Sequence, residues 1–499
     1  MMSENILTQQ KLESYLWGCA EYLRNKIDSG DYKTFIFPML FYKRISDVYD
    51  EEYQKLLEET NDEKFAKNPI NHIFKIPKGC HWNDLREVTK DVGIKIQKSM
   101  QEIGKANSNT LGGIFGDANW GYKERLSDET LIDLIQHFST EKLSISRVPD
   151  DQMGDGYEFL IKKFADDSGH TAAEFYTNRT VVSLMTELLK PCSNEIIYDP
   201  TCGTGGMLLE CINYLKRNKK DFRTISIFGQ EKNLMTSGIA RMNTLLHGYE
   251  DAKIKQGDTL ENPAFLINDK LQKFDVILAN PPYSIKKWNR KKWEQDPFDR
   301  HVYGIPPQSK ADFAFIAHIA CSLNVNGRAA ILLPHGVLFR DGEEILRENL
   351  VNDDIIESVI GLGPNLFYNS PMESCIVILQ KNKKPKRKNK ILFIDALNQV
   401  ERHDHQNYLS TQNIKLISDI FNNFKNVEGI SHVANLDDVK KEYFSLHIRN
   451  YVLPKLILDL RKTNLPLKKT IFNWEKSSQK LRKYFIEIKN DFRMELKID

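Results

Sequence analysis

Short apolar segments alternate with helical patterns between about residues 150 and 380, and this alternation limits the possible folds most strongly. Apolar residues recur every three or four positions within 206–216 and 234–246, as in helices that pack on a core. Alternating strands and helices predict an α/β fold with a doubly wound, mostly parallel sheet. Ligands bind such sheets at the carboxyl ends of the strands. The candidate strands are 195–199, 226–230, 274–279, 328–333, 355–360 and 374–379.

Helical periodicity dominates on both sides of this region. Leu12, Leu16, Cys19 and Leu23 recur at helical spacing, which predicts an all-helical domain over residues 1–150. A cluster of Pro, Asp and Gly over 149–156 indicates a boundary, and the α/β domain is expected over 151–400. Residues 401–499 are expected to form a helical C-terminal region that docks to a partner. Its apolar stripe comprises Leu481, Tyr484, Phe485, Ile488, Phe492 and Leu496.

Charge and cysteine content exclude several classes of protein. The chain has 70 Lys and Arg against 68 Asp and Glu, which argues against a uniformly basic nucleic-acid coat protein and an acidic tail protein. Its 7 cysteines include no Cys-x-x-Cys pair, so a disulfide scaffold or zinc ribbon is poorly supported, and no metal is expected. Neither a signal peptide nor a membrane-spanning run is visible, so we expect a cytoplasmic protein.

A glycine-rich turn follows the first candidate strand. That strand ends in Asp199, and Pro-Thr-Cys-Gly-Thr-Gly-Gly follows at 200–206 before a helix begins. Glycines at 203, 205 and 206 permit a sharp bend and a close approach of a ligand to the backbone. The spacing is Gly-x-Gly-Gly, so the dinucleotide fingerprint is not met. A plain structural turn is the alternative interpretation.

Two acidic residues at successive strand ends favour a nucleoside site. Glu231 ends the next strand, where an acid holds ribose hydroxyls in Rossmann-type sites. Asp258 follows a third short strand and could accept a hydrogen bond from an adenine amino group. Either residue alone would more often be a surface acid or a helix cap. Together they outline a nucleoside cleft without a diphosphate fingerprint, and S-adenosylmethionine fits it best.

The buried-strand pattern at 274–279 ends in Asn280-Pro281-Pro282-Tyr283. The prolines stiffen the turn, so that the Asn280 side-chain oxygen and the Pro281 carbonyl can face one point. Two such acceptors can hold both hydrogens of an exocyclic amine and free its lone pair for attack on a sulfonium methyl. Tyr283 supplies a flat face for stacking, and a base in a duplex would have to flip out to reach it.

Basic and aromatic residues follow this turn, and a second basic run lies further along. The first group can hold phosphates near a flipped base, and a solvated loop is the alternative. The run at 383–390 is either a solvated turn or a phosphate contact. The candidate DNA-binding residues of the first group are Lys286, Lys287, Arg290, Lys291 and Lys292, with Trp288 and Trp293 among them.

These motifs together resemble the N6-adenine DNA methyltransferases, and more narrowly the modification (M) subunits of type I restriction-modification systems. The run 199–208, which contains Gly203, Thr204, Gly205 and Gly206, matches the family's cofactor motif, and Asn280–Tyr283 its catalytic motif. The blocks 229–231, 240–248, 310–315, 333–339 and 364–368 match further. The segment over the cofactor is matched by Glu174, Phe175, Tyr176, Thr177, Asn178 and Arg179, with Asn178 where the family usually has proline.

The resemblance implies partners as well as an activity. It implies an S-adenosylmethionine-dependent methyltransferase domain over 151–400 that modifies double-stranded DNA. A separate specificity (S) subunit would read the target, two modification subunits would join one specificity subunit, and a restriction (R) nuclease-translocase could associate. The alternatives are methylation of a protein glutamine amide or of RNA, and a non-enzymatic assembly protein that retains the fold. Intact Asn280–Tyr283 argues against the last of these.

Overall fold

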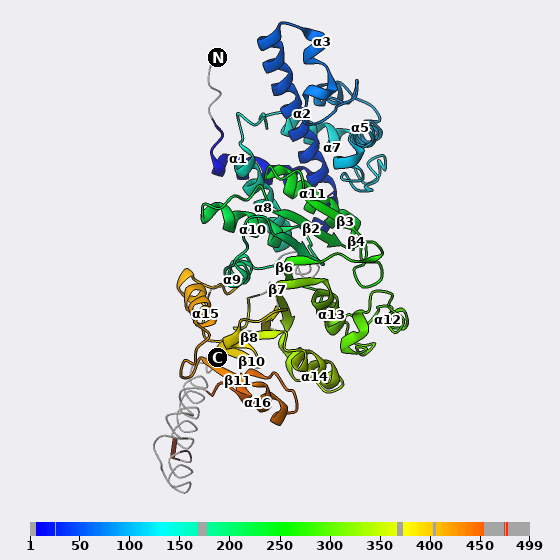
Figure 1. Ribbon diagram of the computed structural model, residues 1–499. Coiled ribbons are helices and arrows are strands. Elements are labelled where there is room, and N and C mark those ends of the chain that lie inside the picture. The colour runs from blue at the N-terminus through cyan, green and yellow to red at the C-terminus, as the bar shows by residue number, and fades with distance from the viewer. Residues whose placement is uncertain are drawn as a thin grey trace, which may run out of the picture.

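The computed structural model describes residues 6–24, 26–167, 177–366, 373–402, 406–453, 474, 476 and 477. Within these residues one large sheet has the order β11-β10-β8-β9-β7-β6-β1-β2-β3, which confirms the α/β fold (Figure 1). The strands β3, β2, β1, β6 and β7 run parallel, as do β8 and β10, while β9 and β11 are antiparallel to their neighbours. The strands are β1 (Ile196–Asp199), β2 (Ser226–Glu231), β3 (Lys253–Gln256), β6 (Phe274–Ala279), β7 (Leu323–Pro334), β8 (Ile356–Leu362), β9 (Ser374–Gln380), β10 (Lys390–Ala396) and β11 (Ser431–Asn435), with β4 (Leu266–Ile267) and β5 (Lys270–Leu271) in a separate hairpin.

Helices cover both faces of the sheet, so its strands are apolar on both sides. Along β6, Val276 and Leu278 belong to one apolar core, whereas Ile277 and Ala279 belong to the other. Helices α9, α10 and α15 pack in the first core, and α13 and α14 in the second. These helices are α9 (Arg179–Leu189), α10 (Gly206–Arg217), α13 (Asp312–Ser322), α14 (Glu344–Asn352) and α15 (Thr411–Asn423). The short α12 (Arg290–Trp293) precedes α13, and the short α16 (Leu436–Lys441) follows β11.

The chain before the sheet is helical, as expected, and has its own apolar core. Its longest helix, α2, continues through Pro38. Helix α8 begins at Asp150, and its Tyr157 and Phe164 pack in this N-terminal core. The helices are α1 (Gln9–Leu23), α2 (Tyr32–Thr60), α3 (Glu63–Ala66), α4 (Trp82–Arg86), α5 (Val92–Ala106), α6 (Ser108–Leu111), α7 (Asp128–Phe138) and α8 (Asp150–Asp167).

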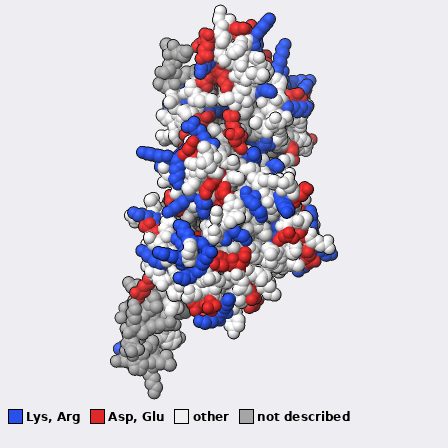
Figure 2. Space-filling view, viewed as in Figure 1, with Lys and Arg blue, Asp and Glu red and all other residues white. Residues whose placement is uncertain are grey.

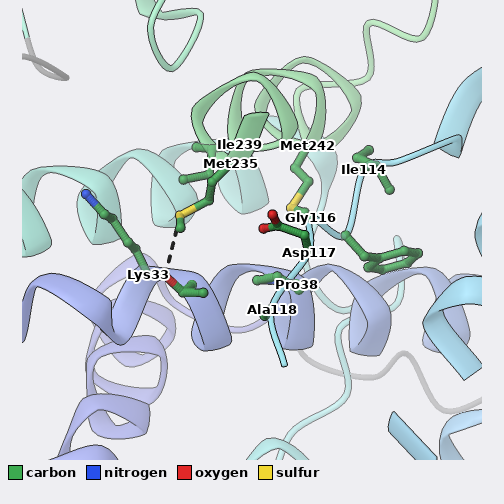
Figure 3. A pocket seen from close by; sticks show the side chains of 11 residues that line it. Lys33, Pro38, Ile114, Gly116, Asp117, Ala118, Met235, Ile239 and Met242 are labelled. Carbon is green, nitrogen blue, oxygen red and sulfur yellow. Dashed lines mark hydrogen bonds between the residues drawn. The ribbon is translucent and has the colours of Figure 1, made fainter. Parts of the chain in front are cut away.

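The N-terminal core also takes in one helix of the sheet region, α11 (Leu234–Leu246). Ile239 and Met242 of α11 lie against Pro38 of α2 and the segment around Ile114 (Figure 3). The Thr34 hydroxyl donates to the Met235 sulfur over 3.5 Å, shown dashed there. Shared packing of this kind holds the helical region and the sheet together.

The described residues beyond 400 continue the same sheet. Strand β11 pairs antiparallel with β10, and Ala434 and Ile448 are buried in one core of the sheet while Ile417 is buried in the other. The predicted apolar stripe 481–496 lies outside the described residues. No helix in the described parts of the chain is both long enough and apolar enough to span a bilayer.

Candidate active site

The glycine turn and the Asn-Pro-Pro-Tyr turn lie at the carboxyl ends of two adjacent strands. The turn at 200–206 follows β1, and Asn280 follows β6. The two strands are paired in parallel, with Ile197 opposite Val276 and Tyr198 opposite Ile277. The sheet order reverses here, because β2 and β3 extend from one side of β1 while β6 and β7 extend from the other. This is the switch point at which open α/β sheets bind ligands.

Left-handed glycines shape the turn after β1. Gly203 and Gly205 have φ of 53° and 83°, a region that other residues rarely adopt. The Gly203 N–H donates to Oε2 of Glu231 over 3.1 Å, so the carboxylate at the end of β2 contacts the turn directly. The Thr204 carbonyl accepts from the Asn243 side chain over 3.0 Å, which anchors the turn to α11.

Two carboxylates, the buried Asp199 and the half-buried Glu231, border this turn with no cation paired to them among the described residues. Asp199 is 1% exposed, and neither it nor Glu231 forms an ion pair within the described part of the chain. Burial raises the pKa of Asp199 to about 8, despite the hydrogen bond that it accepts from the Thr201 N–H. Burial also raises the pKa of Glu231, which accepts from the Asn233 and Gly203 N–H groups. A ligand with a cationic group or hydroxyls would compensate both acids.

Asp258 lies in the loop after β3 and already has several partners. Its Oδ1 accepts from the Leu260 N–H over 3.0 Å, and its Oδ2 lies 2.8 Å from Nζ of Lys232. Arg300 holds the same loop in place: it is 1% exposed and donates to the carbonyls of Thr259 and Leu260. Asp258 is therefore held rigidly at the third strand end.

The segment before α9 is hydrogen-bonded to the Asn-Pro-Pro-Tyr turn and to the chain around Leu366 and Asn407. Asn280 Nδ2 donates to the Thr177 hydroxyl over 3.0 Å. Asn178 caps α9 by accepting from the Thr180 N–H over 3.0 Å, and its Nδ2 donates to the carbonyls of Leu366 and Asn407. Asn178 thus replaces the stiffness of the family's proline with a set of side-chain hydrogen bonds.

Arg179, the next residue, lies against the start of α10. Its guanidinium forms an ion pair with Glu158 of α8 at 2.5 Å, and a Cβ on Gly206 would approach its Nη1 to 2.1 Å. A side chain at position 206 would therefore displace the Arg179 guanidinium from its present position. The predicted cofactor residues Glu174, Phe175 and Tyr176 lie outside the described residues.

Tyr283 is inserted with its hydroxyl inward. The hydroxyl is buried without a hydrogen-bond partner in the described structure, and burial raises its pKa far above the usual value. The residue as a whole is half-buried, so part of the ring remains accessible. Asn280 is also half-buried, and its Oδ1 has no hydrogen-bond partner among the described residues. An acceptor and an aromatic face therefore lie at the same corner.

The predicted DNA-binding residues fall into two groups. Arg290 is paired with Glu294 at 2.6 Å, and Nζ of Lys292 donates to the Glu261 carbonyl over 3.0 Å. The other three, Lys286, Lys287 and Lys291, have no ion pair within the described ranges. Acidic and basic side chains are interspersed over the face in Figure 2, which leaves only local basic surface for phosphates.

The basic run at 383–390 is partly structural. Lys383 is buried and paired with Asp354 at 2.6 Å, and Arg387 is paired with Glu357 at 3.0 Å. No cluster of three or more His, Cys, Asp or Glu with the geometry of a metal site occurs in the portion of the chain that is described.

A second set of residues, which the sequence motifs did not predict, lies beside the Asn-Pro-Pro-Tyr turn. Asp312 and Arg340 form a buried ion pair at 2.7 Å, and Asp312 accepts from the Ser284 N–H. Asp312 belongs to the family block 310–315, and Arg340 directly follows the block 333–339. The position of Asp312 within one block and of Arg340 directly after another is the signal that could have found them.

Comparisons with known proteins agree with this geometry. The family profile described as N-6 DNA Methylase matches residues 148–459, and the HsdM N-terminal domain profile matches 12–138. The MjaVIII methylase subunit, a type I restriction enzyme subunit of Methanocaldococcus jannaschii, is 31% identical over 90% of this chain and 79% of its own length. The MpnII methylase subunit of Mycoplasma pneumoniae is 29% identical over 97% of this chain and 98% of its own.

A solved structure extends the similarity to the fold. The type I restriction-modification methyltransferase subunit from Streptococcus thermophilus has a TM-score of 0.78 and 29% identity, covering 90% of this chain and 100% of that one. Both profiles and these relatives span the helical domain and the sheet together. The chain therefore belongs to the N-6 DNA methylase family and is a methylase subunit of the type I restriction-modification kind.

Proposed function

We propose that this chain transfers a methyl group from S-adenosyl-L-methionine to N6 of an adenine flipped out of duplex DNA. The observation that carries the proposal is the hydrogen bond from Asn280 Nδ2 to Thr177, which fixes the amide and leaves Oδ1 free as an acceptor. The family profile and the names of the relatives support DNA methylation, and adenine follows from the N6 chemistry of that family.

The residues around the glycine turn fit S-adenosylmethionine. The cofactor carries a sulfonium and an ammonium group, and the turn is bordered by the buried Asp199 and the half-buried Glu231, neither of which is paired with a cation among the described residues. In this proposal Glu231 accepts from ribose hydroxyls and Asp258 from an adenine amino group, in addition to the hydrogen bonds that both already accept. The proposed cofactor-binding set is Glu174, Phe175, Tyr176, Thr177, Asn178, Arg179, Asp199, Gly203, Thr204, Gly205, Gly206, Glu231 and Asp258. When bound, the cofactor supplies an electrophilic methyl group.

The catalytic turn acts on the target amine. Oδ1 of Asn280 and the carbonyl of Pro281 accept the two N6 hydrogens, which draws the nitrogen toward tetrahedral geometry and localises its lone pair. Pro282 keeps the turn rigid, and the ring of Tyr283 stacks on the extruded base. The proton leaves late, from a nitrogen that has become cationic, so no strong base is needed. The reaction requires the base outside the duplex because Asn280 and Tyr283 are half-buried, and a base stacked in a duplex could not reach them.

Recognition of the target is assigned to partners. The chain is a methylase subunit of a type I system, and a neighbour of TM-score 0.67 comes from a study of complex assembly in such a system. We propose an assembly of two of these chains with one specificity subunit, acting in the cytoplasm, to which a restriction subunit can be added. Lys286, Lys287, Arg290, Lys291 and Lys292 would hold phosphates near the flipped base.

The test is genome methylation in a host that expresses this chain with its specificity subunit. Sequencing should reveal N6-methyladenine at one motif for the wild type and none for Asn280→Ala. Asn382→Ala, which changes an exposed asparagine far from the turn in sequence, is the matched control and should methylate normally. Absence of a modified motif with the wild type, or full methylation by Asn280→Ala, contradicts the proposal.

Calorimetry separates the roles of the two turns. Glu231→Ala should weaken S-adenosylmethionine binding about tenfold or more, because it removes a hydrogen-bonding carboxylate. Tyr283→Ala should leave cofactor binding nearly unchanged and weaken target-base binding. Equal effects of both variants on cofactor affinity would contradict this division.

A further inference from the structure

The residue after the catalytic turn has an unusual backbone conformation. Ser284 has φ of 53°, in the left-handed region that residues with a Cβ rarely adopt. Its N–H donates to Oδ1 of Asp312 over 2.9 Å. Backbone conformations of this kind persist only where the surroundings enforce them, and they concentrate at functional sites.

Asp312 is itself held in place by a buried ion pair. It is the first residue of α13 and is 1% exposed, and its Oδ2 accepts from Nη2 of Arg340 over 2.7 Å. Nε of Arg340 also donates to Glu343 over 2.9 Å, and its Nη1 lies 3.5 Å from the Ser284 hydroxyl. Arg340 thus contacts both Ser284, whose backbone is strained, and Asp312, whose carboxylate accepts from the Ser284 N–H.

No hydrogen bond to its side chain fixes the ring of Tyr283 within the described structure. Its hydroxyl is buried without a hydrogen bond in the described structure, so the ring direction depends on packing and on the backbone at either side. Pro282 fixes the backbone on one side. On the other side the only side-chain bond to the Ser284 N–H that the described residues show is the one from Asp312.

We propose that Asp312 and Arg340 are positioning residues, which keep Ser284 left-handed and thereby aim the ring of Tyr283 at the flipped base. This inference rests on the proposed function, because it assigns the residues to the target-base side of the same site. It predicts that loss of the carboxylate disturbs base stacking and turnover while cofactor binding survives.

The experiment uses the full chain assembled with its specificity subunit. Duplex DNA carries 2-aminopurine at the target position, whose fluorescence rises when the base leaves the stack. Asp312→Ala should reduce kcat about 10- to 100-fold, since it removes a charge-assisted hydrogen bond, and should alter the 2-aminopurine signal. The Kd for S-adenosylmethionine should change less than about twofold.

A second substitution makes the mechanism testable by rescue. Glycine adopts positive φ readily. Adding Ser284→Gly to Asp312→Ala should therefore raise kcat at least about tenfold above that of Asp312→Ala alone. Ser284→Val leaves the ion pair in place but disfavours the left-handed backbone, and should lower kcat alone. Because Ser284→Val leaves the side chain of Asp312 unchanged, it tests the positioning role even if Asp312→Ala fails to fold.

The control is Glu195→Gln, which alters a different half-buried ion pair, with Arg328, at the other end of the sheet. It should keep wild-type kcat. Normal kcat in Ser284→Val, or parallel losses of cofactor affinity and kcat in Asp312→Ala without rescue by glycine, would overturn the positioning role. A wild-type complex that methylates no adenine refutes the proposed function instead, so the two failures are distinguishable.

Discussion

Asp199 provides a quantitative test of the candidate cofactor site through the pH dependence of stability. Its side chain is 1% exposed, forms no ion pair with the described residues, and has a pKa of about 8, compared with 3.8 in an unfolded chain. The folded protein therefore binds one more proton than the unfolded protein between about pH 4 and pH 8. Stability must fall as pH rises through this window, and the Asp199 contribution levels off above about pH 8.

The magnitude follows from the two pKa values. Each pH unit across the window, from 3.8 to about 8, costs about 1.4 kcal/mol, so the complete effect has a ceiling of about 6 kcal/mol. Asp199→Asn removes the ionisation while retaining an oxygen that can accept from the Thr201 N–H. The advantage in stability of the variant over the wild type should grow from at most about 2 kcal/mol at pH 5 to several kcal/mol at pH 8.

The assay is urea unfolding at several pH values between 5 and 9, for the wild type and Asp199→Asn. Asp251→Asn, at an exposed aspartate, is the matched control and should follow the wild type. Calorimetry of S-adenosylmethionine binding in buffers of different ionisation enthalpy should show proton release near pH 7, because a cationic ligand lowers the pKa of Asp199. If the free energy of unfolding changed with pH in the same way for the wild type and Asp199→Asn, the conclusion that Asp199 is desolvated and unpaired would be wrong.

Three further perturbations probe the helical domain, the phosphate contacts and the loop before α9. Gly93→Ala places a Cβ 1.8 Å from a neighbouring tryptophan carbonyl and should lose about 3 kcal/mol in urea unfolding, whereas Gly30→Ala, with open space around it, should lose less than about 1. Lys287→Ala should make the plot of the logarithm of the DNA association constant against the logarithm of salt concentration less steep by about 1. Lys292→Ala should change this slope by less, since the Lys292 ammonium is bonded to a backbone carbonyl. Asn178→Pro removes a helix cap and two bonds to carbonyls and should lower stability by about 1–3 kcal/mol in thermal unfolding; unchanged stability would show these bonds to be unimportant.

The central strands and their helices could be predicted because local pattern and tertiary role coincide there. Helix α11 has the predicted bounds, Leu234–Leu246, and β6 is the predicted 274–279 segment. Buried strands of a parallel sheet are continuous apolar runs, and Asn233 caps α11 through the Thr236 N–H. Strand β7 begins at Leu323 rather than at 328. The sequence pattern did not reveal this start, because residues 324–326 include two asparagines and are partly or fully exposed.

The sequence patterns did not predict the elements that depend on partners far away in the chain. Strand β10 follows the basic run closely, and the polar β11 at the sheet edge is defined by its antiparallel pairing with β10. The bond between Asn280 and Thr177 joins residues 103 positions apart, and Asp312 lies 28 positions from Ser284. Neither spacing has a local signature. The motifs located the two turns, whereas the side chains that hold them depend on how the sheet brings distant segments together.

Transfer of an isotope-labelled methyl group tests the central claim most directly. The purified chain, assembled with its specificity subunit, is incubated with methyl-labelled S-adenosylmethionine and duplex DNA, and the DNA is digested to nucleosides for mass spectrometry. The label should appear in N6-methyldeoxyadenosine with the wild type and be absent with Asn280→Ala. Label in a methylated cytosine, in RNA or in a protein glutamine, with none in adenine, would contradict the account.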